Sequence, residues 1–420
     1  MTAQLPDVTL IKAARLADGL ATSSRPGQAV LVRAGRIEAV GPAPELERLA
    51  APGARIVDLG SACLTPGLID GHTHTSLAGD GRTYAEMFAE TDELMVLTGV
   101  MNLQKHLTAG ITTIREHGAR NRVGFALREG LHRGYFGGPR MLVSGRPITC
   151  TGGHFHMCNE TADGEDAIRR SVRRLFHEGA DYIKIMASGG GTTGTDAGRA
   201  SYTTDELRAA VHEAHHFGLL TAAHCRASES MVRAVEAGID LMEHAEFLDH
   251  DHELRFDPKI AAMMAESGMY VSPTLQAWTR YPRMVDLRAR RDAGLSSPAE
   301  DSELERLEER AEHRLDVLRR MLDYGMRDRI VPGTDSGPSI LAFGHMDYDL
   351  QLLVRAGFSP AEALLAATRV SAEALNLDTD IGTIAPGKMA DLVAFDGDPT
   401  VDAGAFSRVV AVFQAGRRVR

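Results

Sequence analysis

The sequence predicts an α/β protein, with a (β/α)8 barrel in the middle of the chain and a small β-sandwich built from its two ends. Strand-like and helix-like patterns alternate over roughly 310 residues, which is typical of parallel sheets built from βαβ units. Eight candidate strands fall in that region, whereas both ends of the chain contain only short strands and turns. The chain has 420 residues, 44% of them hydrophobic and 25% charged, enough for one large barrel and an appended module.

The two ends are predicted to form the sandwich together. Residues 1–63 and 381–420 contain brief apolar or alternating runs separated by turn residues, and neither segment is large enough to bury a core alone. We therefore expect them to pair beside the barrel, which spans residues 64–380. The candidate strands are Val8–Ala13, Gln28–Arg33, Arg36–Val40, Arg55–Asp58, Ala390–Asp396 and Val409–Gln414.

The barrel strands are predicted from apolar runs, and the helices between them from 3.6-residue periodicity. The candidate strands are Leu64–Asp70, Ile111–Glu116, Arg140–Ser144, Tyr182–Ala187, Leu219–His224, Asp240–His244, Tyr270–Thr274 and Ile330–Thr334. The candidate helices include Asp92–Thr108, Asp163–His177, Thr204–His216, Ser228–Ala237 and Pro258–Ser267. A further helix begins at Ser359-Pro-Ala-Glu, which combines a capping box with proline at the first helical position.

One charged insertion, residues 282–324, interrupts the alternation late in the barrel. Its sequence Ser297-Pro-Ala-Glu starts a helix, and apolar residues recur at helical spacing from Leu304 to Leu322. An amphipathic helix packed on the barrel exterior is the simplest interpretation. A lid over the site or a contact between subunits is the alternative.

Chemistry in such barrels takes place at the carboxyl ends of the strands, and six candidate residues lie there. His72 and His74 end the first strand in P-G-L-I-D-G-H-T-H, and their i, i+2 spacing points both imidazoles to one side. The other four candidates are Lys184, His224, His244 and Asp335, at the ends of strands four, five, six and eight. Each alone has an ordinary structural explanation, but a lysine inside a barrel strand is costly without a partner. All six together indicate a metal centre.

These motifs resemble the amidohydrolase superfamily of metal-dependent hydrolases, and within it the imidazolonepropionase-like and Xaa-Pro dipeptidase group. The resemblance rests on P-G-L-I-D-G-H-T-H, T-A-G-I-T-T-I-R, T-G-G-H, Y-I-K-I, A-A-H, E-H and G-T-D. The closing I-G-T-I-A-P-G-K-M-A-D-L-V-A-F-D matches as well, so the similarity covers nearly the whole chain.

The resemblance implies two divalent metal ions, with zinc the best match to imidazole and carboxylate ligands. His72 and His74 would bind the more buried ion together with Asp335, and His224 and His244 would bind the more exposed ion. Lys184 would bridge the two ions after carboxylation by CO2, since an ammonium group has no lone pair and repels cations. A metal-activated hydroxide would then cleave a C–N amide bond, with Asp335 as general base and then general acid.

Four further residues are candidates for contacts with the substrate. By the same resemblance, the Tyr202 hydroxyl would stabilise the tetrahedral oxyanion, which makes it a second catalytic candidate. His154, in T-G-G-H, would bind the substrate. His117 and Arg199 are additional candidates for substrate binding.

Composition excludes several other classes of function. The net charge of −11 argues against nucleic acid or an anionic membrane as partner, because both require basic patches. The sequence contains no apolar run of membrane-spanning length and no signal-peptide pattern, and its four cysteines lack C-x-x-C spacing. We therefore expect a cytoplasmic enzyme for a small-molecule amide or peptide substrate. Because related enzymes are commonly oligomeric, we also expect a homo-oligomer.

Three functional hypotheses remain at this point. The first is a binuclear hydrolase of linear amides, such as dipeptides or N-acyl amino acids. The second is a mononuclear enzyme that opens a cyclic amide or deaminates a heterocycle, for which a bridging Lys184 would have no purpose. The third is a non-catalytic scaffold, which the complete set of candidate ligands disfavours.

Overall fold

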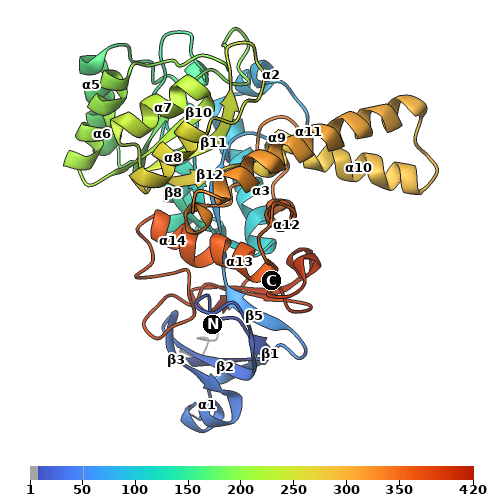
Figure 1. Cartoon of the computed structure of the whole chain (residues 1–420). Helices are drawn as coiled ribbons and strands as arrows, with labels where there is room; N and C mark the ends of the chain where they lie inside the picture. Colours follow the sequence, from blue (N-terminus) through green and yellow to red (C-terminus); the bar gives the residue numbers. More distant parts are fainter. Residues whose placement is uncertain (1–7, 51) are drawn as a thin grey trace.

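The computed structural model describes residues 8–50 and 52–420. Figure 1 shows a sheet built from both ends of the chain at the bottom, and a larger part with parallel strands and most helices above it. Within the described ranges, no helix is both long and apolar enough to cross a membrane.

The first and last strands of the chain form one eight-stranded sheet, in the order β15-β14-β13-β5-β1-β2-β3 with β4 beside β1. The last part of the chain joins the first where β13 pairs antiparallel with β5, and Val393 lies opposite Thr65. One face of this sheet buries a cluster that includes Ile11, Leu64 and Phe413. The opposite face packs against Leu46 of α1 (Ala43–Leu49). The strands are β1 Val8–Leu16, β2 Arg25–Arg33, β3 Arg36–Pro42, β4 Arg55–Asp58, β5 Cys63–Pro66, β13 Leu392–Phe395, β14 Val409–Gln414 and β15 Arg417–Arg418.

The larger part contains two parallel sheets, β6-β7-β8 and β12-β11-β10-β9. Single parallel bridges extend this pairing, from Ile148 to Ile185, from Val271 to Ile330 and from Thr73 to Ser336. The strands are β6 Leu68–Thr73, β7 Ile111–Glu116, β8 Arg140–Val143, β9 Tyr182–Met186, β10 Leu220–Ala227, β11 Leu241–Leu248 and β12 Tyr270–Ser272. These sheets confirm the predicted α/β class with parallel strands.

Two predicted strands differ from the structure. The run Leu64–Asp70 is divided, because the Gly67 amide bonds to Asp391 O at 2.8 Å while the next amide bonds to Gly110 O at 3.0 Å. Glycine is required there, since a Cβ would lie 2.1 Å from Thr112 Oγ1. Ile330–Thr334 forms only an isolated bridge, because the Thr334 amide bonds to the Asp70 carboxylate instead of a neighbouring strand.

Some helices begin at capping boxes that can be recognised in the sequence. Thr203 with Glu206 and Ser359 with Glu362 form capping boxes at the starts of α6 and α13. The predicted boundaries of α3, α6, α7 and α8 are confirmed residue for residue. The helices around the parallel strands are α2 Tyr84–Phe88, α3 Asp92–Thr108, α4 Val123–His132, α5 Glu165–His177, α6 Thr204–His216, α7 Ser228–Ala237, α8 Pro258–Ser267, α9 Leu275–Thr279, α12 Met346–Arg355, α13 Pro360–Leu365 and α14 Ser371–Ala374.

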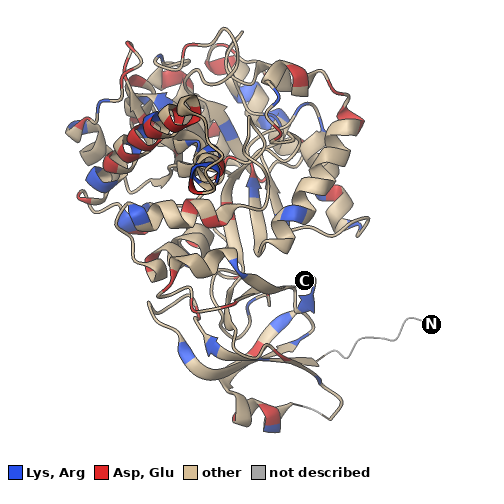
Figure 2. Cartoon of the chain, turned by 90° about the vertical axis from the view of Figure 1, so that its right-hand side faces the viewer, with Lys and Arg blue, Asp and Glu red and all other residues tan. Residues whose placement is uncertain are grey.

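The charged insertion forms a helical hairpin of α10 (Tyr281–Asp292) and α11 (Pro298–Leu322), which projects to the right in Figure 1. The hairpin carries both acidic and basic residues and projects toward the viewer in Figure 2. Arginines of α10 pair with glutamates of α11, as in Arg288 Nε to Glu308 Oε1 at 2.7 Å. The outer part of the hairpin projects from the body, whereas the apolar residues of α11 predicted from Leu304 to Leu318 are buried in the main hydrophobic core, as expected for an amphipathic helix.

Candidate active site

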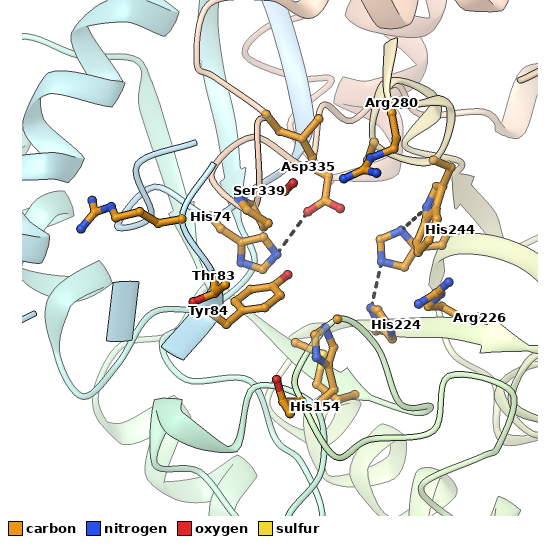
Figure 3. Close-up of a pocket in the computed structure, with 18 of the residues that line it drawn as sticks. His74, Thr83, Tyr84, His154, His224, Arg226, His244, Arg280, Asp335 and Ser339 are labelled. Carbon is orange, nitrogen blue, oxygen red and sulfur yellow. Dashed lines mark hydrogen bonds and ion pairs between the residues drawn. The ribbon is translucent and has the colours of Figure 1, made fainter. Parts of the chain in front are cut away.

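A cavity of about 460 Å³ opens where β6, β9, β10 and β11 end (Figure 3). Five of the six residues predicted at strand ends line it, and the sixth, His72, is buried beside it. The cavity is lined by His74, Gly81, Arg82, Thr83, Tyr84, His154, Lys184, Met186, Gly191, Thr193, His224, Arg226, His244, Ala277, Trp278, Arg280, Asp335, Pro338, Ser339 and Leu341.

His72 and His74 converge on Asp335. Their Nε2 atoms lie 3.4 and 3.5 Å from Asp335 Oδ1. The Asp335 amide donates to His72 O at 2.8 Å, which fixes the aspartate beside the end of β6. Gly333 permits this approach, because a Cβ there would lie 2.6 Å from His72 Cβ. The predicted common orientation of the two imidazoles is confirmed.

His224 and His244 form a second pair on the opposite side of the cavity. His244 Nε2 lies 2.9 Å from His224 Nδ1, so both nitrogens face the same space. The His244 ring is tied by Nδ1, which lies 2.8 Å from Thr274 Oγ1 and 3.1 Å from Trp278 Nε1. The two histidine pairs adjoin, since the rings of His72 and His244 are 5.1 Å apart.

Hydrogen bonds to acceptor oxygens assign the tautomers of three of these imidazoles. His224 Nε2 lies 3.1 Å from Gly189 O, and His74 Nδ1 lies 3.4 Å from Gly118 O. A carbonyl only accepts, so these nitrogens carry the hydrogen and the opposite nitrogens keep a lone pair directed at the cluster. His72 Nδ1 has the same relation to Glu243 Oε2 at 2.7 Å. This arrangement is the one that histidine ligands require.

Burial keeps the four imidazoles uncharged. It lowers the pKa of His74 to about 3 and the pKa values of His72, His224 and His244 well below their ordinary range. Burial also raises the pKa of Asp335 to about 7. Neutral imidazoles beside a carboxylate form a donor set suited to a divalent cation. The ligand atoms of His72, His244 and Asp335 all lie within 4.8 Å of one another, close enough to hold a metal ion.

Lys184 lies in β9 and is completely buried. Its Nζ has no hydrogen-bond partner among the described residues. Burial lowers the pKa of Lys184 to about 8, an effect that the charge of Glu243 partly opposes. An unpartnered buried amine at the cavity wall is costly, and its lowered pKa favours the neutral, nucleophilic form.

The remaining predicted residues lie in different places. His154 lines the cavity, with Nδ1 2.8 Å from Thr192 Oγ1. His117 does not line the cavity. It lies beside His72, with the two rings 4.0 Å apart, and its Nε2 is 2.8 Å from Gly71 O. Arg199 is exposed and pairs with Asp196 at 3.1 Å.

Tyr202 is not brought to the cavity. It is buried, and its hydroxyl donates to Ala162 O at 2.8 Å, so the phenol is committed to packing at the start of α6. The phenol that lines the cavity is Tyr84, whose hydroxyl points into the space beside His74 and Asp335 in Figure 3. The structure thus contradicts the expected place of Tyr202 at the cavity. Sequence analysis did not single out Tyr84, because it follows no strand and belongs to a short helix.

Sequence analysis also missed Glu243 and an aromatic–arginine pair. Glu243 is fully buried between His72 and His117, and the E-H motif contained it without a role. Arg226 stacks on the Trp278 ring at 4.1 Å and bonds to Glu246 at 2.5 Å. Trp278 is the only tryptophan of the chain, and its place beside His244 follows from α9, which the sequence did not predict.

Known proteins resemble this chain along most of its length. The model of the amidohydrolase family matches residues 63–419. The ochratoxinase of Aspergillus niger is 26% identical over 381 residues, covering 83% of this chain and 73% of that protein. The imidazolonepropionase of Pyrobaculum arsenaticum is 26% identical over 394 residues, covering 88% and 85%. The structure of a prolidase complexed with N-methylphosphonate-L-proline has a TM-score of 0.81 at 26% identity, covering 98% of this chain and 99% of that one.

Proposed function

Because the chain belongs to the amidohydrolase family, we propose that it is a metal-dependent hydrolase of a C–N bond in a linear amide, such as a dipeptide or an N-acyl amino acid. One observation carries the proposal. The Nε2 atoms of His72, His74 and His244 and the Nδ1 atom of His224 face the space around Asp335 and Lys184, whose Nζ bonds to none of the described residues, at the wall of a single cavity. The names of the prolidase and ochratoxinase relatives agree with hydrolysis.

We propose that the site holds two divalent cations, with zinc as the preferred ion. His72, His74 and Asp335 would hold one ion, and His224 and His244 the other. Lys184, after its amine attacks CO2 and releases a proton, would offer two carbamate oxygens to both ions. Bound metal would supply Lewis acidity, which polarises an amide carbonyl and lowers the pKa of water.

The chain's own residues would move the proton and stabilise developing charge. Asp335 is 14% exposed toward the cavity, so its carboxylate has access to a proton released there. It would accept that proton and deliver it to the departing amine nitrogen, which leaves poorly as an anion. The Tyr84 hydroxyl would donate a hydrogen bond to the carbonyl oxygen as negative charge develops on it.

The proposed fold places these groups at one rim. We propose that the three single parallel bridges close the two sheets into a (β/α)8 barrel over residues 64–380. The segments 1–63 and 381–420 would form the accompanying sandwich, and the chain would assemble as a homo-oligomer.

The similarity to imidazolonepropionase favours a second candidate, a mononuclear enzyme for a cyclic amide. Metal analysis and a substrate panel separate the two. We expect two equivalents of metal per chain and turnover of N-acyl amino acids or dipeptides by the metal-loaded protein. One equivalent together with turnover of lactams alone would favour the second candidate.

The same assay tests catalysis itself through Asp335→Asn. This variant keeps an oxygen near both histidines but is a far weaker base, so kcat should fall at least 100-fold, given that general acid–base catalysis contributes about 10² to 10⁴. Unchanged activity would mean that Asp335 transfers no proton in the reaction, and would contradict the proposed mechanism.

A further inference from the structure

The backbone of β11 is unusual at His244, one of the proposed metal ligands. Three non-glycine residues of this strand have positive φ angles: His244 at 71°, Ala245 at 48° and Phe247 at 56°. In this region the Cβ atom crowds the backbone, so such residues persist only when the surroundings hold them. The pairing of β10 with β11 is regular up to Cys225 opposite His244 and shifts register immediately beyond.

One buried side chain, that of Arg314, donates hydrogen bonds to the backbone of this irregular segment. Arg314 of α11 donates through Nη1 to Ala245 O at 3.2 Å and through Nη2 to His244 O. Arg314 is only 3% exposed, so its guanidinium is shielded from water. Its planar fork thus engages two consecutive carbonyls of β11 at the point where the strand register shifts.

The α10–α11 hairpin and the neighbouring α9 contact His244 from two directions. Arg314 reaches the His244 backbone from α11, while Trp278 Nε1 reaches the ring from α9, which immediately precedes α10. Ion pairs between the arms stiffen the hairpin, as in Arg283 to Glu303 at 2.8 Å and Arg290 to Glu300 at 3.0 Å. The projecting insertion is therefore connected directly to the site.

We propose that the α10–α11 hairpin is a positioning device for His244, with Arg314 as the positioning residue that holds the left-handed backbone of His244 and Ala245. This inference rests on the proposed function, because it assigns His244 as a metal ligand. Without Arg314, the segment relaxes toward ordinary strand geometry and the imidazole moves out of line with His224. An arginine that merely attaches α11 to the body would affect stability and leave metal affinity unchanged.

The test compares Arg314→Met with Arg306→Met, which removes an exposed arginine of the same helix. Metal content is measured after equilibration against a graded series of zinc chelators, with no substrate present. We expect Arg314→Met to bind one of its two zinc ions at least tenfold more weakly, as is typical when groups that orient a ligand are removed. Arg306→Met should match the wild-type protein. Equal zinc affinity in Arg314→Met and wild type, or equal weakening in both variants, overturns the inference.

A rescue variant separates positioning from stability. Ala245→Gly introduces the one residue that adopts positive φ without crowding, so Arg314→Met combined with Ala245→Gly should regain part of the lost zinc affinity. A double variant no better than Arg314→Met contradicts the inference. If Arg314→Met does not fold, the zinc affinity of Arg314→Lys is compared with that of the wild-type protein instead. Lysine keeps the charge but cannot bond two carbonyls with one planar fork. Absence of zinc from the wild-type protein would instead overturn the proposed function.

Discussion

Replacing Glu243 with glutamine should weaken the binding of the metal ion that His72 is proposed to hold. Glu243 is fully buried, and its Oε2 lies 2.7 Å from His72 Nδ1, so it determines which ring nitrogen keeps the lone pair. A hydrogen bond to a charged group contributes about 1.5 to 3 kcal/mol, and each 1.36 kcal/mol corresponds to a factor of ten. Because glutamine retains an oxygen acceptor but no charge, we expect zinc affinity to fall about tenfold, at the lower end of that range.

The same substitution should also lower stability. Glu243 lies 3.7 Å from Arg115, whose Nη1 and Nε have no hydrogen-bond partner among the described residues. Removing the carboxylate leaves this buried guanidinium with only the Tyr182 ring, 3.9 Å away, for compensation. Loss of one member of a buried ion pair typically costs about 3 to 5 kcal/mol, which denaturant unfolding of the metal-free protein would detect.

The matched control is Glu116→Gln. Glu116 is equally buried and lies on β7, which pairs with β6, but its carboxylate oxygens bond to none of the described side chains. Zinc release to a competing chelator is measured for the wild-type protein and both variants. The reasoning is refuted if Glu243→Gln releases zinc like the wild-type protein, or if Glu116→Gln weakens binding equally.

Three further predictions concern single side chains. Tyr84→Phe should lower kcat roughly 10²-fold, whereas Tyr202→Phe should leave kcat unchanged and cost about 1 kcal/mol of stability; steady-state kinetics showing the reverse would reinstate Tyr202. Burial raises the pKa of Glu116 to about 8 from its ordinary value of 4.5, so its stabilising contribution is full below pH 4.5 and is lost as the pH rises through 8. Glu116→Gln should therefore gain stability relative to the wild-type protein between pH 5 and pH 8, and parallel unfolding curves across that range would contradict this. Metal-loaded protein prepared with ¹³C-bicarbonate should show a carbamate carbon signal that Lys184→Ala lacks; a signal that survives the substitution would exclude Lys184 as its source.

The six residues predicted at strand ends lie close together in the structure, because the direction of each strand fixes where these residues come to lie. His72 and His74 are two residues apart in an extended segment, so their shared orientation is a property of strand geometry. Gly333 was visible in the G-T-D motif, but its purpose, the close approach to His72, appears only when both segments are in place.

Residues outside the strand ends were harder to predict. Tyr84 and Tyr202 both lie near helix starts, and only packing shows that one hydroxyl faces the cavity while the other bonds to Ala162. In a regular strand Glu243 and His244 would face opposite sides, yet both lie beside His72, because the backbone leaves the regular alternation at His244. Local backbone distortion of this kind has no marker in a residue pattern, since neither His244 nor Ala245 is glycine.

The pairing of β13 with β5 has a consequence for biosynthesis. β5 immediately precedes the strand that ends on His72 and His74, yet its antiparallel neighbour is separated from it by more than three hundred residues of sequence. A ribosome will therefore have made every proposed ligand well before the support for the first of them exists. The proposed ions should therefore bind only after β13 has been made, and a chain that lacks β13 should retain no metal.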